Sequence, residues 1–302
     1  MAAFEGNIEA LEREISVDKR AVTRELAGSS WTPLFFAVAG MEVDAVRLLL
    51  GLNKTLVSDQ IPIDTRDDAG KTFLVRAIET GSPEVVQVLL EFRADPNFVC
   101  NDRSPLFIAV CCGNQQIVEL LLKKKADVNW ISKDKKESVL HAAAKGNLVI
   151  LEMLLRVKSV NLRSTNDKEE TPLHLSCDLG LIGCARALIA AGVEVNVSDQ
   201  HGITPLMISS KKGHDKIVEL LLSGREMDPN LCDELHRSAL LFAATEGHLK
   251  VCEILVKAKV ECSTADFETN WTPLMAAVNG NHVDVVRLLA PETDLTIQSA
   301  KG

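Results

Sequence analysis

A short motif that recurs along the whole chain constrains the fold more than any other feature. It is Thr or Ser, then in most copies Pro, then always Leu, and its copies begin at Thr32, Thr72, Ser104, Ser138, Thr171, Thr204, Ser238 and Thr272. The first step is 40 residues and the later steps are 32 to 34 residues. A fixed period of this length is typical of stacked structural repeats, none of which can bury its apolar face alone.

The residues after each motif follow one pattern. Thr and Ser are good helix N-caps, and Pro is tolerated at the first helical position. A glycine follows at Gly40, Gly81, Gly113, Gly146, Gly180, Gly213, Gly247 and Gly280, and we expect it to end a short first helix in a left-handed conformation. A Leu-rich stretch then predicts a second, amphipathic helix, and a segment rich in Asp, Asn, Gly and Pro predicts a turn or hairpin.

This pattern resembles the ankyrin repeat family. The resemblance is carried by Thr-Pro-Leu-His at 171–174, Gly-His at 213–214 and 247–248, and Ala-Asp-Val-Asn at 126–129. It covers nearly the whole chain and implies an all-α solenoid of stacked helix-turn-helix repeats with projecting hairpins. We expect a single domain over 1–302, with a partial capping repeat at 1–30 and repeats at 31–70, 71–102, 103–136, 137–169, 170–202, 203–236, 237–270 and 271–302.

The two ends of the chain differ in this interpretation. In the partial first repeat, the side chains of Phe4, Ile8, Leu11 and Ile15 are predicted to face inward. Residues 297–302 resemble the turn that introduces another repeat, so we interpret the chain as part of a longer protein.

Two departures from the pattern affect the loops. An insertion around residues 51–63 predicts a longer loop after the second helix of its repeat. Only Gly70 and Gly202 provide a glycine in the hairpin, so the sequence leaves the geometry of the other hairpins open.

Charge and cysteine content narrow the class of protein. The net charge is −9, which disfavours nucleic acid or an anionic membrane surface as the main partner. Eight cysteines without a Cys-x-x-Cys motif in a chain of this length do not indicate a disulfide framework. There is no secretory signal and no apolar run long enough to span a membrane. We expect a cytoplasmic protein, with the nucleus as the other possible location.

The sequence lacks the usual catalytic motifs. It contains no glycine-rich phosphate loop, no nucleophile elbow and no His-Glu-x-x-His. His174 and Cys177 have a spacing that could hold a metal on a helix, but both occupy framework positions of the repeat, which favours packing. We therefore expect no enzyme activity, no metal and no cofactor.

The resemblance implies binding of another protein or peptide, as an adaptor or scaffold. In ankyrin repeats the concave face, made of turn tips and first helices, usually takes the partner. The residue before each Thr or Ser has no framework role, Trp and Arg are enriched in binding hot spots, and Trp130 stands in a turn where a small residue is usual. The candidate partner-binding residues are Trp31, Lys71, Arg103, Trp130, Arg237 and Trp271.

Two further functions stay open at this point. The array could be the recognition domain of a larger enzyme or channel whose activity lies beyond Gly302. As in other ankyrin arrays, it could also be a substrate for asparagine hydroxylation, at the turn positions Asn97, Asn129, Asn161, Asn196 and Asn230.

Overall fold

The structure is a computed structural model that describes residues 3, 7–17, 32–56 and 62–300. Phe4 and Trp31 therefore lie outside the described residues. The described secondary structure is helical, apart from three isolated β-bridges in the hairpins. The chain forms two compact units, unit 1 (Met1–Lys133) and unit 2 (Asp134–Gly302), and each is described by itself. The all-α prediction is confirmed.

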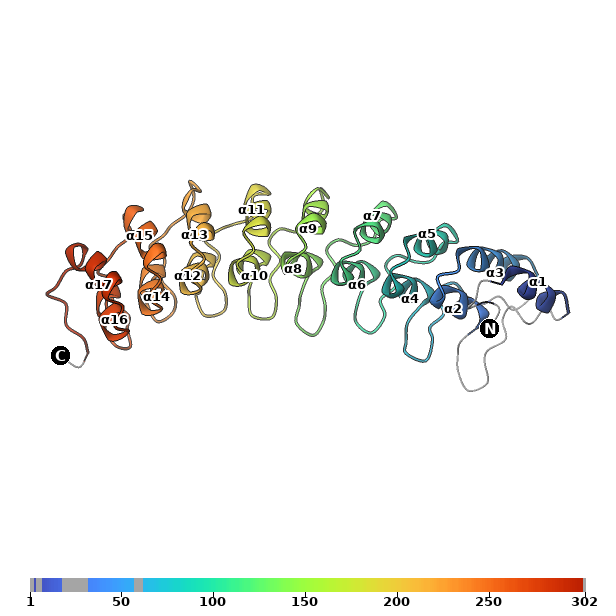
Figure 1. Ribbon diagram of the computed structural model, residues 1–302, viewed down its shortest axis with the longest axis horizontal. Helices are drawn as coiled ribbons and strands as arrows, with labels where there is room; N and C mark the ends of the chain where they lie inside the picture. The colour runs from blue at the N-terminus through green and yellow to red at the C-terminus, as the bar shows by residue number, and fades with distance from the viewer. Residues whose placement is uncertain (1–2, 4–6, 18–31, 57–61, 301–302) are drawn as a thin grey trace. The chain divides into compact units, whose positions relative to one another are not determined.

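Unit 1 contains one leading helix followed by three helix pairs (Figure 1). The helices are α1 (Ile8–Val17), α2 (Pro33–Ala39), α3 (Val43–Leu56), α4 (Phe73–Thr80), α5 (Pro83–Glu91), α6 (Pro105–Cys112) and α7 (Gln115–Lys123). First helices pack on first helices and second helices on second helices, so α4 contacts both α2 and α6. Leu11 and Ile15 of α1 are buried as predicted, whereas Ile8 is only half-buried.

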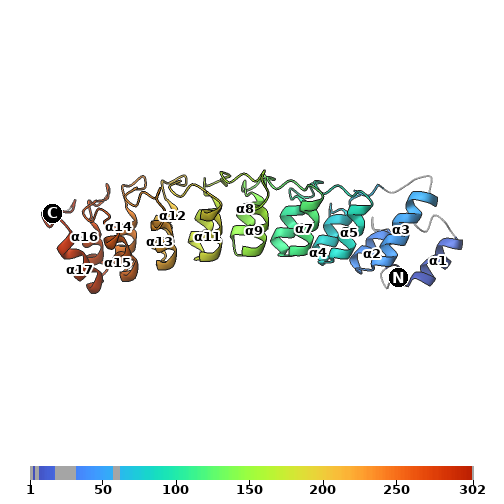
Figure 2. The same ribbon diagram turned by 90° about the horizontal axis from the view of Figure 1, so that it is seen from above.

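Unit 2 continues the same pattern in five helix pairs. They are α8 (Val139–Ala144), α9 (Leu148–Leu155), α10 (Pro172–Asp178), α11 (Ile182–Ala190), α12 (Pro205–Lys211), α13 (Asp215–Leu222), α14 (Ala239–Thr245), α15 (Leu249–Lys257), α16 (Pro273–Asn279) and α17 (Val283–Leu289), followed by the short 3-10 helix η2 (Ala290–Glu292). Within this unit the first helices form one layer, the second helices another, and the hairpins project beyond the first helices (Figure 1). Figure 2 shows the hairpins gathered along one edge.

Most N-caps form as the motif predicts, although the buried hydroxyl of Thr32 has no hydrogen-bond partner. The hydroxyl of Ser104 accepts the backbone N–H of Phe107 at 3.1 Å, and the hydroxyl of Thr204 accepts that of Met207 at 3.3 Å. The leucine of the motif points into the core, where Leu106 is fully buried. Each cap thus places an apolar side chain between the two helix layers.

The left-handed residue after the first helix is not always the glycine. Gly81 follows α4 with φ 79°. Gly40 and Gly280 stand one position closer to their N-caps and are right-handed, with φ −77° at both. The left-handed conformation passes to Met41 (φ 60°) and Asn281 (φ 56°). The prediction that glycine ends every first helix in a left-handed conformation is therefore wrong at these two positions, where the residue after the glycine takes that conformation.

The insertion after the first full repeat begins as helix rather than as loop. Helix α3 continues through Leu56, so the prediction of a loop is wrong for residues 51–56. Residues 57–61 lie outside the described part of the chain.

The hairpins keep their geometry without glycine. Glu169, His236 and Asn270 adopt φ of 62°, 61° and 55°, comparable with 78° at Gly202. A carboxylate or amide at the start of the hairpin holds the turn closed in each case. In one hairpin, Oδ1 of Asp233 accepts two backbone N–H groups, from positions 235 (3.0 Å) and 237 (2.7 Å). This side-chain hydrogen bonding offsets the cost of a left-handed non-glycine residue.

Side chains also connect each repeat to the next. His174 accepts the backbone N–H of its N-cap Thr171 at Nδ1, so Nε2 donates to the carbonyl of Ile203 at 3.1 Å. His248 Nε2 lies 3.0 Å from the carbonyl oxygen of Lys211 in the preceding repeat.

The hairpin tips of unit 2 are joined by backbone hydrogen bonds. Glu234 N–H donates to the carbonyl of His201 at 3.2 Å, and Phe267 N–H donates to the carbonyl of Leu235 at 3.0 Å. Neighbouring hairpins therefore support one another along the edge seen in Figure 2.

We expect the stability of the chain to fall in mild acid. Burial lowers the pKa of His141 and His174 below the ordinary value of 6.5, because the charged ring loses hydration. The contribution of these rings is complete above pH 6.5 and is lost as the pH falls from 6.5 through the lowered pKa, since the unfolded chain then binds the protons first. Melting temperatures between about pH 7.5 and about pH 5 measure the effect.

The control for this prediction is the double variant His141→Asn, His174→Asn. It should melt at a lower temperature than the wild-type chain at neutral pH, because the ties to Glu170 and Ile203 are lost. Its melting temperature should change less with pH. If the melting temperatures of both proteins changed equally with pH, the pH dependence could not be assigned to His141 and His174.

A second prediction concerns the contact between hairpins. A Cβ at Gly202 (φ +78°) would lie 2.8 Å from the backbone nitrogen of Glu234 and 3.0 Å from Cα of Asp233, whereas a Cβ at Gly192 (φ +84°) meets nothing within 4 Å. Both substitutions to Ala strain the backbone by about 1 kcal/mol. Gly202→Ala should lower the free energy of unfolding, measured in urea, by roughly 2 kcal/mol more than Gly192→Ala does. Equal losses would show that the hairpins do not constrain each other.

Candidate functional site

Two positions of each repeat lie close enough for their side chains to pair, the residue before the N-cap and the residue at the end of the first helix. In unit 1, Lys71 Nζ lies 2.7 Å from Oε1 of Glu79 at these positions. In unit 2, Lys145 Nζ lies 2.5 Å from Oε1 of Glu137. These charges satisfy each other within one repeat, so both pairs already have a partner inside the chain.

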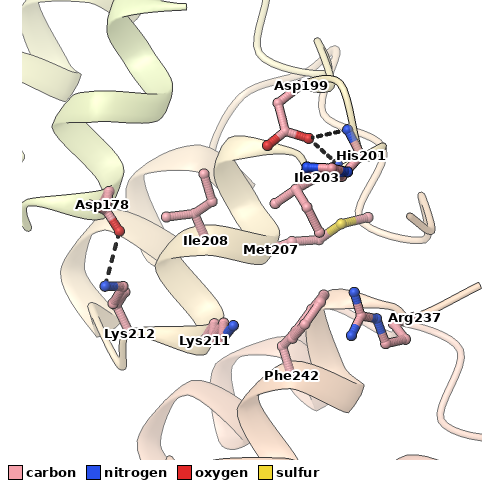
Figure 3. A pocket seen from close by; sticks show the side chains of 10 residues that line it. All are labelled: Asp178, Asp199, His201, Ile203, Met207, Ile208, Lys211, Lys212, Arg237 and Phe242. Atoms are coloured by element: carbon pink, nitrogen blue, oxygen red, sulfur yellow. Dashed lines mark hydrogen bonds and ion pairs between the residues drawn. The ribbon is translucent and has the colours of Figure 1, made fainter. Parts of the chain in front are cut away.

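In the repeat at 203–236, the same two positions hold Ile203 and Lys211. These side chains cannot pair, and a hollow of about 360 Å³ opens here between α12 and α14 (Figure 3). Its lining consists of Asp178, Asp199, His201, Ile203, Met207, Ile208, Lys211, Lys212, Arg237 and Phe242. This volume lies in the lower range of ligand pockets.

Asp178 and Asp233 are in ion pairs, whereas Asp199 bonds to hairpin N–H groups and has no cation partner among the described residues. Lys212 Nζ lies 3.1 Å from Oδ1 of Asp178. Arg237 donates from Nε to Oδ2 of Asp233 at 2.7 Å, and that carboxylate is almost fully buried. Oδ1 of Asp199 accepts two N–H groups of its own hairpin.

Two cations flank one aromatic ring in this hollow. Cζ of Arg237 lies 4.9 Å from the ring centroid of Phe242, and Nζ of Lys211 lies 5.7 Å from it. Figure 3 shows Phe242 between these two side chains, with Met207 beside them. Lys211 is exposed and forms no ion pair with any carboxylate of the described residues. The hollow thus combines an apolar floor with a cation that lacks an acidic partner.

The predicted residues of unit 1 have different surroundings. Lys71 is half-buried in its ion pair with Glu79. Arg103 is exposed, and its backbone closes the hairpin with Cys100. Trp130 is half-buried, because its ring packs on Phe107 with centroids 5.0 Å apart.

In unit 2, only one of the predicted residues lies in the hollow. Arg237 lines it, as described above. Trp271 is half-buried, and its backbone N–H donates to Oδ2 of Asp266 at 3.1 Å. Trp31 cannot be placed, since it lies outside the described residues.

Of the residues that line the hollow, the sequence candidates include Arg237 alone, and those that they miss include Met207, Lys211 and Phe242. A signal for Lys211 is present in the sequence. It is the pair of charges at the residue before the N-cap and the residue at the end of the first helix. Opposite charges predict an internal pair, whereas Ile203 with Lys211 predicts an open position. Phe242 carries no such signal, because its role depends on the neighbouring repeat.

The candidate metal pair is engaged in packing. Both ring nitrogens of His174 have hydrogen-bond partners. Burial raises the pKa of the Cys177 thiol to about 12, which suppresses the thiolate that a metal requires. In the described ranges, His, Cys, Asp and Glu side chains form no group of three or more suited to a metal ion.

None of the described helices combines the length and apolar character needed to cross a membrane.

The sequence as a whole agrees with this architecture. The family described as ankyrin repeats (3 copies) matches residues 1–100, 51–134, 92–164, 139–231 and 225–299. No curated protein matches the sequence. Ankyrin repeats are generally protein–protein interaction modules and are typically not enzymes. The helix pairs, their caps and these matches establish that the chain belongs to the ankyrin repeat family.

Proposed function

We propose that this chain is an adaptor or scaffold that binds a partner protein at the hollow between α12 and α14. One observation carries this site. A hollow of about 360 Å³ lies beside Ile203 and Lys211, and Lys211 has no acidic partner among the described residues, whereas Lys71 with Glu79 and Glu137 with Lys145 pair inside their repeats.

The form of the hollow supports a protein partner. The half-buried side chains of Ile203 and Ile208 provide apolar surface above the buried Met207 and Phe242, and the exposed Lys211 and Lys212 lie beside it. An apolar centre with a polar rim is the usual composition of a binding hot spot. The site also lies on first helices and hairpins, the elements that the resemblance to ankyrin repeats nominates.

The cysteines support a reducing location. All eight thiols are free, and burial raises the pKa of the thiols of Cys177 and Cys252 to about 12. Such thiols persist in the cytoplasm or nucleus, where disulfides are rare. We propose that the partner is met there.

A photo-crosslinking residue tests the site. Placed at Ile203, it should give discrete adducts with a partner in a cell extract, whereas the same residue at Lys216, exposed on α13, should not. The purified partner should then bind the variant Ile203→Ser about tenfold more weakly than the wild-type chain in calorimetry, because apolar contact is lost. Adducts at Lys216 alone, or equal affinities, would place the partner elsewhere.

Arg103 and Trp130 are proposed as a second contact in unit 1, and their variants separate binding from stability. Trp130→Ala should lower the melting temperature, because its ring contact with Phe107 contributes about 0.5–1.5 kcal/mol beyond buried area. Arg103→Ala should leave the unfolding free energy within about 0.5 kcal/mol of wild type. Both should weaken binding of the crosslinked partner. An unchanged affinity for Arg103→Ala would remove unit 1 from the interface.

A further inference from the structure

We infer that the hollow selects an extended acidic peptide segment, with an aliphatic side chain on its floor and a carboxylate against Lys211. This inference rests on the proposed function and adds the chemistry of the partner. It follows from the apolar floor, from Lys211, which has no acidic partner among the described residues, and from the ion-paired carboxylates of Asp178 and Asp233.

The floor is suited to an aliphatic side chain. Ile203 and Ile208 are half-buried, Met207 is buried, and Phe242 presents its ring between two repeats. A volume of about 360 Å³ admits side chains of a peptide rather than a folded element. The flexible thioether of Met207 adapts to branched or unbranched aliphatic groups.

The lysine and arginine side chains of the hollow favour a negatively charged partner. Lys212 is neutralised by Asp178, and Arg237 uses Nε and one terminal nitrogen on Asp233. Lys211 retains all its donors, and Arg237 keeps N–H groups that Asp233 does not use. A carboxylate placed near Phe242 would therefore receive charge-assisted hydrogen bonds that no group of the hollow already accepts.

The same rim disfavours a basic segment. A second cation beside Lys211 and Arg237 would be repelled at short range, and the apolar floor reduces the screening by water. The net charge of −9 also disfavours long polyanions such as nucleic acid, whose binding depends on many phosphate contacts. A short segment with one or two carboxylates avoids that repulsion.

Four fluorescein-labelled peptide pools test the selection in fluorescence anisotropy with the full chain. One alternates Asp or Glu with Leu, Ile or Met, and the second replaces the acids by Lys or Arg. The third combines acids with Ser and Gly, and the fourth combines the aliphatic residues with Ser and Gly. We expect the acidic–aliphatic pool to bind at least about tenfold more tightly than each of the others, since only it fills both subsites.

Lys211→Glu should reduce the affinity for the acidic–aliphatic pool by about tenfold or more, because an attraction becomes a repulsion. Lys216→Glu is the matched control, with the same charge change on the exposed surface of the same repeat, and should bind as the wild-type chain does. Unchanged melting temperatures confirm that both variants fold.

The outcomes separate this inference from the proposed function. If the pools bind equally, or if Lys211→Glu binds the acidic–aliphatic pool as the wild type does, the peptide class is wrong. A partner crosslinked at Ile203 would then still support the proposed function. If nothing crosslinks at Ile203 in the experiment above, the proposed function fails at this site whatever the pools show.

Discussion

Every repeat depends on its neighbour for hydrogen bonds that its own residues do not supply. A helix pair of this size leaves carbonyl groups at its edge, and the next repeat or the preceding one satisfies them. Nε2 of His174 donates to Ile203, and the amide of Asn196 contacts both Glu226 and Asp228. Stability in such an array is therefore a property of adjacent pairs rather than of single repeats.

The sequence predicts well those parts of the fold that do not depend on a neighbouring repeat. N-caps, buried leucines and helix pairs are local, and their pattern repeats, so chance cannot produce it eight times. The prediction of a left-handed glycine is wrong after α2 and α16, because the residue after the glycine takes that conformation instead. Helix α3 likewise continues into the insertion, through Gly51 and Asn53, as far as Leu56.

The candidate site was harder to predict, because its character arises between repeats. Arg237 was chosen as a free position, yet its guanidinium lies on the buried Asp233 and against Phe242 of the following helix. Lys71 was chosen on the same grounds and lies in an ion pair. The position of a residue in the repeat predicts which way its side chain points. Whether that side chain forms an ion pair depends on the other residues that lie beside it.

The hydrogen bond from Glu234 to the carbonyl of His201 has a consequence for recognition. These residues belong to the two hairpins beside the hollow, so the bond fixes the separation of its walls before any ligand arrives. A preorganised site loses little conformational entropy when it is filled. The two hairpins thus hold the walls of the hollow at a fixed distance. Contacts with a bound peptide then contribute to affinity, because no free energy is needed to order the loops.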